Sequence, residues 1–168
     1  MKKILLSVAL AVSSLCASAQ FFVGGTAGIA VNTIGESAST SFVICPEGGY
    51  KFNDSWAVGA NINTGYHHAG GAGYGIVGIT PYARYTFANV ESVHFYGEAA
   101  LPINGNFYKG YSAGHFGIAL RPGFLVDLTD NLQMIGRTTL LSCGVSGGSA
   151  QVGIAIANEF TMGVVYNF

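Results

Sequence analysis

The sequence predicts an all-β protein, an eight-stranded antiparallel up-and-down barrel that spans a membrane. Three observations predict this fold. Half of the 168 residues are hydrophobic and only 9% are charged, whereas a soluble surface carries about 25–35% charged residues. From residue 21 onwards apolar residues alternate with small or polar ones, which is the period of strands rather than helices. The charges inside the predicted strands all fall on the parity opposite to the apolar one.

The composition also excludes several classes of protein. A formal net charge of −1 is not that of a basic nucleic-acid-binding domain. After residue 20 no stretch has the roughly 20 apolar residues of a spanning helix, because Gly, Asn, Thr and His interrupt the uncharged runs. A membrane protein built of this chain would therefore cross with strands.

The first 19 residues are expected to be a signal peptide. Lys2 and Lys3 form a short basic region, an apolar run follows, and Ala17-Ser18-Ala19 has the small-x-small form of a cleavage site. The mature chain would begin at Gln20, and residues 20–168 would form the barrel domain. Export makes a disulfide chemically possible, but two cysteines in the mature chain, Cys45 and Cys143, leave their pairing open.

The first four strands are expected over residues 21–31, 41–52, 56–66 and 75–87. The first follows the cleavage site and ends at a polar connection, and the second ends at Asn53-Asp54. The third and fourth alternate most clearly. Their shared apolar parity consists of Trp56, Val58, Ala60 and Ile62, and then of Val77, Ile79, Ala83, Tyr85 and Phe87.

The last four strands are expected over residues 93–104, 114–128, 132–145 and 151–168. The fifth follows the short connection 88–92. The sixth carries Phe116, Ile118, Leu120, Phe124, Val126 and Leu128 on one parity. The seventh begins after the turn at Asp130, and the eighth ends in an alternating apolar segment.

Charged residues inside the strands are predicted to face the lumen and to form a paired network. They are Glu47, Lys51, Arg84, Glu98, Arg121, Asp127, Arg137 and Glu159. Alternation alone does not distinguish a soluble lipocalin-like barrel from an outer-membrane barrel. The polar parity is mostly Gly, Ala, Ser, Thr and Asn, which is too sparse in charge for a water-facing surface and suits a narrow, filled lumen.

Aromatic residues on the apolar parity gather near one end of the strands, as an interfacial girdle requires. The predicted girdle consists of Phe21, Tyr50, Phe52, Trp56, Tyr85, Phe87, Phe95, Tyr166 and Phe168.

Three proline motifs repeat along the chain and indicate repeated hairpins with tight turns. They contain Pro46, Pro81 and Pro122, each followed by alternating apolar residues and then by Asp or Asn. The other connections, over residues 32–40, 67–74 and 105–113, are expected to be longer loops on the opposite side. Short periplasmic turns and longer outer loops are typical of outer-membrane barrels. Proline lacks the ladder N–H, so each proline implies a bulge or another local irregularity.

The last strand alternates apolar residues up to a terminal aromatic, at Phe160, Met162, Val164, Tyr166 and Phe168. This pattern resembles the signal by which the outer-membrane assembly machinery selects its clients. The whole mature chain resembles the small porin-like outer-membrane β-barrel domain family of Gram-negative envelopes. The resemblance is carried by Pro46-Glu-Gly-Gly-Tyr50-Lys-Phe52-Asn-Asp54, Thr80-Pro-Tyr-Ala-Arg84-Tyr-Thr-Phe87, and Leu120-Arg-Pro-Gly-Phe124 with Thr129-Asp130-Asn131. It implies an eight-stranded barrel and few family-wide catalytic or ligand residues.

Several motifs resemble functional sites, but their context favours other interpretations. Gly73-Tyr-Gly75-Ile-Val-Gly78 matches the dinucleotide fingerprint, but no helix is expected after it. His67 and His68 would point to opposite faces of an extended chain, so no metal site is expected. His94 and His115 could partner Ser112 or Ser142 in a lipid hydrolase, yet their parity faces inward, and hydrogen bonding within the lumen is the preferred interpretation.

The sequence therefore predicts a non-enzymatic, cofactor-free and monomeric barrel in the outer membrane of a Gram-negative bacterium. Its role would be structural, adhesive or surface-interacting, with a lumen filled mainly by side chains. The expected partners are outer-membrane lipid and the barrel assembly machinery, and no nucleic acid. The alternatives are a narrow pore or small-ligand-binding barrel, since many lumenal positions such as Gly59 are small, and a lipid-modifying enzyme.

Overall fold

The computed structural model describes residues 20–34, 37–69, 72–146, 149–154 and 160–168. The predicted signal peptide therefore lies outside the described residues. Alternating sequence gives eleven strand segments, whose bounds are β1 Phe21–Ile34, β2 Ser37–Lys51, β3 Trp56–Ala69, β4 Ala72–Val90, β5 Val93–Ala100, β6 Ile103–Tyr108, β7 Tyr111–Asp127, β8 Leu132–Thr138, β9 Leu141–Ser146, β10 Ser149–Ile154 and β11 Phe160–Asn167.

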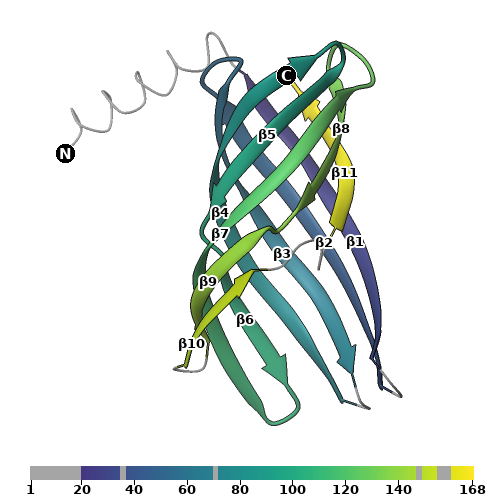
Figure 1. Ribbon diagram of the computed structural model, residues 1–168, viewed down its shortest axis with the longest axis vertical. Helices are drawn as coiled ribbons and strands as arrows, with labels where there is room; N and C mark the ends of the chain where they lie inside the picture. The colour runs from purple at the N-terminus through teal and green to yellow at the C-terminus, as the bar shows by residue number, and fades with distance from the viewer. Residues whose placement is uncertain (1–19, 35–36, 70–71, 147–148, 155–159) are drawn as a thin grey trace, which may run out of the picture.

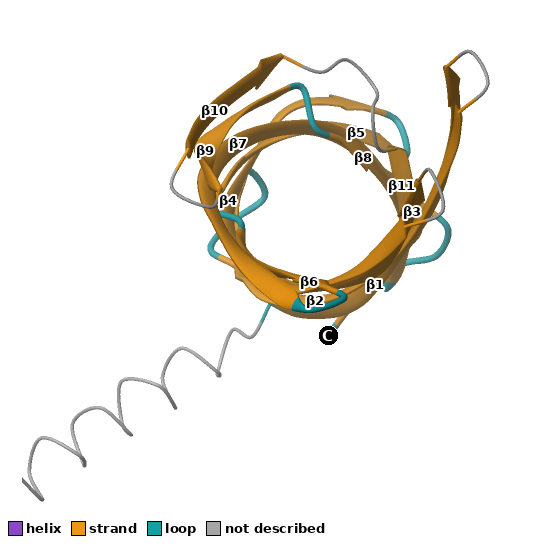
Figure 2. Cartoon of the chain, turned by 90° about the horizontal axis from the view of Figure 1, so that it is seen from below, coloured by secondary structure: helices purple, strands orange, loops and turns teal. Residues whose placement is uncertain are grey.

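These eleven segments make the eight staves of a closed antiparallel barrel (Figure 1). β5 and β6 share their two neighbours, β4 and β7, and together form the fifth stave. β8 and β9 both pair with β7 and form the seventh. β10 pairs antiparallel with β9, and β11 pairs with β8 and β1, which closes the ring seen in Figure 2. The predicted fold class, with eight antiparallel staves, is confirmed.

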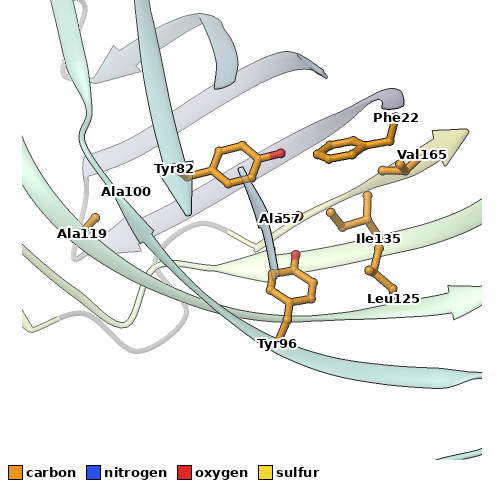
Figure 3. Close-up of a cluster of buried hydrophobic side chains, with 9 residues drawn as sticks. All are labelled: Phe22, Ala57, Tyr82, Tyr96, Ala100, Ala119, Leu125, Ile135 and Val165. Atoms are coloured by element: carbon orange, nitrogen blue, oxygen red, sulfur yellow. The ribbon is translucent and has the colours of Figure 1, made fainter. Parts of the chain in front are cut away.

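Inward and outward faces alternate along each strand as the parity predicts. The lumen holds a cluster of buried side chains, Phe22, Ala57, Tyr82, Tyr96, Ala100, Ala119, Leu125, Ile135 and Val165 (Figure 3). The outer face carries large exposed apolar residues from every stave, among them Ile62, Ile79, Ile118 and Val164. The part of the chain that the structure describes contains no helix long and apolar enough to cross a membrane.

The expectation of longer loops on one side is wrong. β1 and β2 stay paired up to Ile34 and Ser37, β3 and β4 up to Ala69 and Ala72, and β6 and β7 up to Tyr108 and Tyr111. These segments are rich in Ser, Thr, Ala and Gly and have no apolar parity, so their sequence pattern does not reveal a strand. Ladder hydrogen bonds need only the backbone, and the strands therefore run on through the predicted loops.

Each of the three prolines faces an interruption in the ladder of a neighbouring strand. The β2–β3 register stops at Ile44 and resumes at Glu47, which leaves out Cys45 and Pro46. Pro81 faces the break at residues 101–102 between β5 and β6. Pro122 faces the break at residues 139–140 between β8 and β9, where the register shifts by one residue. The missing proline N–H therefore coincides with an interruption of the regular ladder on one side of the strand; at Pro81 the carbonyl still accepts a bond from Leu101 N at 2.9 Å.

Candidate functional site

Three charged side chains from adjacent strands meet in the middle of the lumen. Glu98 of β5 stands directly opposite Arg84 of β4 and Arg121 of β7. Arg84 donates from Nε and Nη2 to Glu98 Oε1, at 3.0 and 2.8 Å. Arg121 Nη2 approaches Glu98 Oε2 to 2.8 Å, as an ion pair that is off the hydrogen-bonding angle. One carboxylate thus lies between two guanidinium groups.

A second carboxylate connects opposite sides of the barrel. Glu47 of β2 accepts a 2.6 Å hydrogen bond from Arg137 Nη1 of β8, a residue 90 positions away in the sequence. The same oxygen accepts from Asn61 Nδ2 at 3.0 Å and from the Tyr82 hydroxyl at 3.2 Å. Arg137 Nη2 donates to Thr26 Oγ1 of β1 at 2.9 Å. Charge-assisted bonds of this length are the stronger class of protein hydrogen bonds.

We call Glu47, Arg84, Glu98, Arg121 and Arg137 the lumenal plug. Glu47, Arg84, Glu98 and Arg137 are all buried, and Arg121 keeps 12% of its side chain exposed. The Arg84 guanidinium lies 4.5 Å from the centre of the Tyr96 ring and 5.2 Å from that of Tyr82, in cation–π range. With three arginines and two glutamates, the plug has a formal charge of +1.

Small lumenal residues provide room for the aromatic rings around the plug. A Cβ at Gly59 would lie 2.7 Å from the Tyr82 hydroxyl, so a side chain there would displace the ring. Phe22 lies against the lumenal face of Gly49 in the same way. Figure 3 shows the Tyr82 and Tyr96 rings projecting into the lumen from β4 and β5. Near the plug, aromatic rings therefore fill the space beside these lumenal glycines, and the glycines do not leave a water path there.

On the side of the plug away from the chain termini, which points down in Figure 1, the lumen opens into a cavity of about 410 Å³ that we call the upper cavity. Arg121 and Arg137 lie at its boundary with the plug, and hydroxyl and amide side chains such as Ser142, Asn63 and Asn104 line its wall. Asn63 donates to Asn104 Oδ1 at 2.8 Å, which connects β3 to β6. The wall also includes apolar side chains such as Val43 and Ile76, so the cavity is of mixed polarity with two arginines at one end.

On the other side of the plug, at the end that carries the C-terminus, a second group of polar residues surrounds a wider opening that we call the lower mouth. Asp127 accepts from Gln133 Nε2 at 2.6 Å and lies 2.8 Å from His94 Nε2. Lys51 Nζ reaches Gln133 Oε1 at 3.5 Å. Two residues of the predicted network, Lys51 and Asp127, thus lie together, but in this mouth and apart from the plug. The remaining one, Glu159, lies outside the described residues.

Four uncharged residues that the sequence reasoning missed contact the plug. Asn61 and Tyr82 bond to Glu47, Thr26 bonds to Arg137, and Tyr96 stacks under Arg84. All four lie on the lumenal parity; Asn61 stands opposite Glu47, and Tyr82 and Tyr96 each lie two residues from a charged residue of the same strand. A search for uncharged hydrogen-bonding side chains on that parity would have found them.

The glycine motif and the histidines singled out in the sequence lie at separate places in the barrel. Gly73, Gly75 and Gly78 are all within strand β4. His67 faces the lumen and contacts the Tyr74 ring at 5.0 Å, whereas His68 is exposed on the outer face. His115 and Ser142 both line the upper cavity, and Ser112 is exposed.

Cys45 and Cys143 do not form a disulfide with each other. Cys45 is buried on the lumenal side, where its thiol lies 3.6 Å from Asn63 Oδ1. Cys143 is exposed on the outer face of β9. The two thiols therefore lie on opposite faces of the wall.

The predicted aromatic girdle lies on the outer wall near the end with the C-terminus. Trp56 and Tyr85 are cross-strand neighbours with ring centres 4.8 Å apart, and Phe21 and Tyr50 pair at 5.2 Å. Tyr166 and Phe168 pack edge to face at 5.1 Å. The remaining members of the girdle are Phe52, Phe87 and Phe95. All members are exposed except Tyr50, which is half-buried. The predicted assembly residues Phe160, Met162, Val164, Tyr166 and Phe168 all lie on this outer face.

Solved structures with a similar fold are small outer-membrane β-barrels. The chain is similar to Neisserial surface protein A, with a TM-score of 0.62 and 19% identity over 88% of this chain and 97% of that one. It is also similar to outer membrane protein H of Pseudomonas aeruginosa, with a TM-score of 0.54 and 17% identity over 89% and 99% of the two chains. The outer membrane protein OprG of P. aeruginosa gives a TM-score of 0.52 and 16% identity over 89% and 92%. No protein-family model and no curated protein sequence matches the chain. The likeness is one of fold, that of the small eight-stranded outer-membrane barrels.

Proposed function

We propose that this chain is an integral β-barrel of a Gram-negative outer membrane, with a structural, adhesive or surface-interacting role and a lumen closed by the plug. The observation that carries the proposal is the inside-out distribution of polarity. Charges within the described strands lie inside the barrel, and the outer wall is covered by exposed apolar residues such as Ile62, Ile79 and Ile118. This is the arrangement that lipid favours and water does not.

The dimensions of the wall support a membrane-spanning barrel. The longest strand, β4, has 19 residues. At a rise of ~3.3 Å per residue and a tilt of about 40°, such a strand extends about 48 Å along the axis, against an apolar band about 25 Å tall. The barrel is therefore tall enough to cross the membrane and to project beyond it on one side.

We assign the end with the termini to the periplasm. Phe168 N donates to Phe21 O at 2.9 Å, so the two ends of the described chain meet there. An exported chain enters the membrane from the periplasm, and an even number of staves returns it to the same side. The hairpins β1–β2, β3–β4 and β6–β7 would then project outwards, where a surface partner could contact them.

We infer a non-enzymatic role and two partners, namely outer-membrane lipid and the barrel assembly machinery, which would read the C-terminal strand. The porin-like resemblance suggests the alternative of a narrow pore, and the plug opposes it. Four of the five plug residues are buried, and together they connect β2, β4, β5, β7 and β8 across the lumen.

Envelope fractionation of an expressing Gram-negative strain, followed by gels of heated and unheated samples, tests the proposal. The expected result is protein in the outer-membrane fraction that migrates faster unheated, because a folded barrel stays compact in detergent. Recovery from the soluble fraction, with the same migration before and after heating, would contradict it.

A further inference from the structure

The upper cavity combines the volume of a ligand site with a positively charged floor. Its volume of about 410 Å³ is within the range of small-molecule pockets, about 300–1,000 Å³. Among its lining residues in the described part of the chain, Arg121 and Arg137 are charged and none is acidic. Hydroxyl and amide groups, including Ser142, Asn63 and Asn104, supply further hydrogen-bonding positions on the wall.

The plug does not neutralise this floor. Its two carboxylates face three guanidinium groups, which leaves one positive charge in excess among the described residues; Glu159 lies outside them and is not counted. Lys51 and Asp127 offset each other in the lower mouth. A buried excess charge is costly unless a counter-charge approaches it.

Arg121 is the plug guanidinium with the fewest hydrogen bonds among the described residues, and it lines the cavity. Arg137 already donates to Glu47 and Thr26, and Arg84 is fully engaged with Glu98 and with the aromatic rings. Arg121 has one hydrogen bond, from Nη1 to Asn61 Oδ1 at 3.2 Å. Its Nη2 is paired with Glu98 Oε2 at 2.8 Å, and its buried Nε has no hydrogen-bond partner among the described residues. It also keeps more of its side chain exposed than the other plug arginines, at 12% against 3% and 4%.

We propose that the upper cavity binds a small oxyanion, a carboxylate or a phosphate, against Arg121. Guanidinium groups bind both through charge-assisted hydrogen bonds. Ser142 lies across from Ala119, two residues before Arg121 on the same face, so its hydroxyl is a near neighbour of the site. The ligand would enter from the end opposite the termini. The proposal depends on the barrel fold alone, so a failure of the proposed location would leave it standing.

The test is a titration of the full barrel domain, refolded in detergent micelles and followed by ¹⁵N spectra. Sodium phosphate and sodium acetate are the two probes, each added at constant ionic strength against sodium chloride. The expected result is a saturable shift of the backbone amides of Ala119, Arg121 and Ser142, with a dissociation constant on the order of 1 mM. The probe that saturates at the lower concentration identifies the class of oxyanion.

Three variants make the test specific. Arg121→Gln should weaken binding at least about tenfold, and Ser142→Ala, which leaves the plug intact, a few-fold. Lys109→Gln removes an exposed positive charge at the same end of the barrel and should bind as the wild type does. If Arg121→Gln fails to fold, Ser142→Ala against Lys109→Gln still decides. Shifts that rise linearly with both probes, or that are equal in Ser142→Ala and the wild type, would overturn the proposal.

Discussion

Glu98 is the residue through which two arginines of the plug are held together. It pairs with Arg84 and Arg121 on the neighbouring strands, and its side chain is fully buried. Loss of its charge would leave three guanidinium groups facing Glu47 alone. Loss of Arg84 would instead leave two arginines and two glutamates, which balance. The two ends of one ion pair are therefore unequal in their effect on the charge of the lumen.

This inequality gives a prediction for urea unfolding in lipid vesicles. Glu98→Gln should lower the free energy of unfolding by about 3–5 kcal/mol, because it leaves buried positive charge without a counter-charge. Arg84→Gln should cost less, and the double variant should be milder than Glu98→Gln alone. Tryptophan fluorescence of Trp56 reports the transition in each variant. Losses that add within about 0.5 kcal/mol would mean that the two side chains do not interact.

The sequence could predict which charged residues face the lumen, but not all of their partners. Parity assigns a face to each residue, and the short connection after β4 places Arg84 near Glu98. They stand directly opposite each other because an irregularity between Thr86 and Ala88 shifts the register by one residue, which alternation alone does not predict. The Glu47–Arg137 contact joins residues 90 positions apart. It depends on the closure and shear of the barrel, which alternation does not contain.

At the scale of the strand, the repeated prolines mark positions where the ladder is interrupted on one side and continues on the other. Pro46, Pro81 and Pro122 each coincide with a gap in a neighbouring ladder, and Glu47 and Arg121 are immediate sequence neighbours of two of them. The sequence could predict that the prolines are irregular, but not that the gaps fall beside the plug. At the end of the barrel opposite the termini, the strands extend beyond their predicted bounds. The sequence could not predict this extension because those segments pair through the backbone without an apolar parity.

The C-terminal strand β11 gives a prediction about assembly. Phe168 is exposed beside Tyr166, and its backbone N–H closes the barrel onto Phe21. If the exposed aromatic end is read by the assembly machinery, deletion of Phe168 should leave unfolded protein in the periplasm at unchanged synthesis. Refolding of the same variant into lipid vesicles in vitro should be nearly normal.

Phe52→Ala is the matched control, because Phe52 is another exposed girdle aromatic, in a turn rather than at the chain end. It should assemble as the wild type does. Normal amounts of the Phe168 deletion in the outer membrane would show that this residue is not part of the signal.

For the whole molecule, the girdle fixes where the barrel should meet the membrane surface. Trp56 is the single tryptophan of the chain, lies on the outer face and stacks near Tyr85. Its fluorescence should be quenched by brominated lipids, and most strongly when bromine lies close to the headgroup, since indole rings prefer the interface. Strongest quenching by bromine at the end of the acyl chain, or no quenching, would contradict a position of the girdle at the membrane interface.

The central claim is that the barrel spans the membrane and that the plug closes its lumen. Conductance across a planar lipid bilayer tests it most directly, with insertion verified by Trp56 quenching in vesicles of the same lipid. We predict no steady current steps for the wild type. A variant that replaces all five plug residues by Ala, and so leaves no uncompensated charge among them, should give measurable current. Steady, uniform steps from the wild-type protein would contradict the claim and show that the lumen conducts.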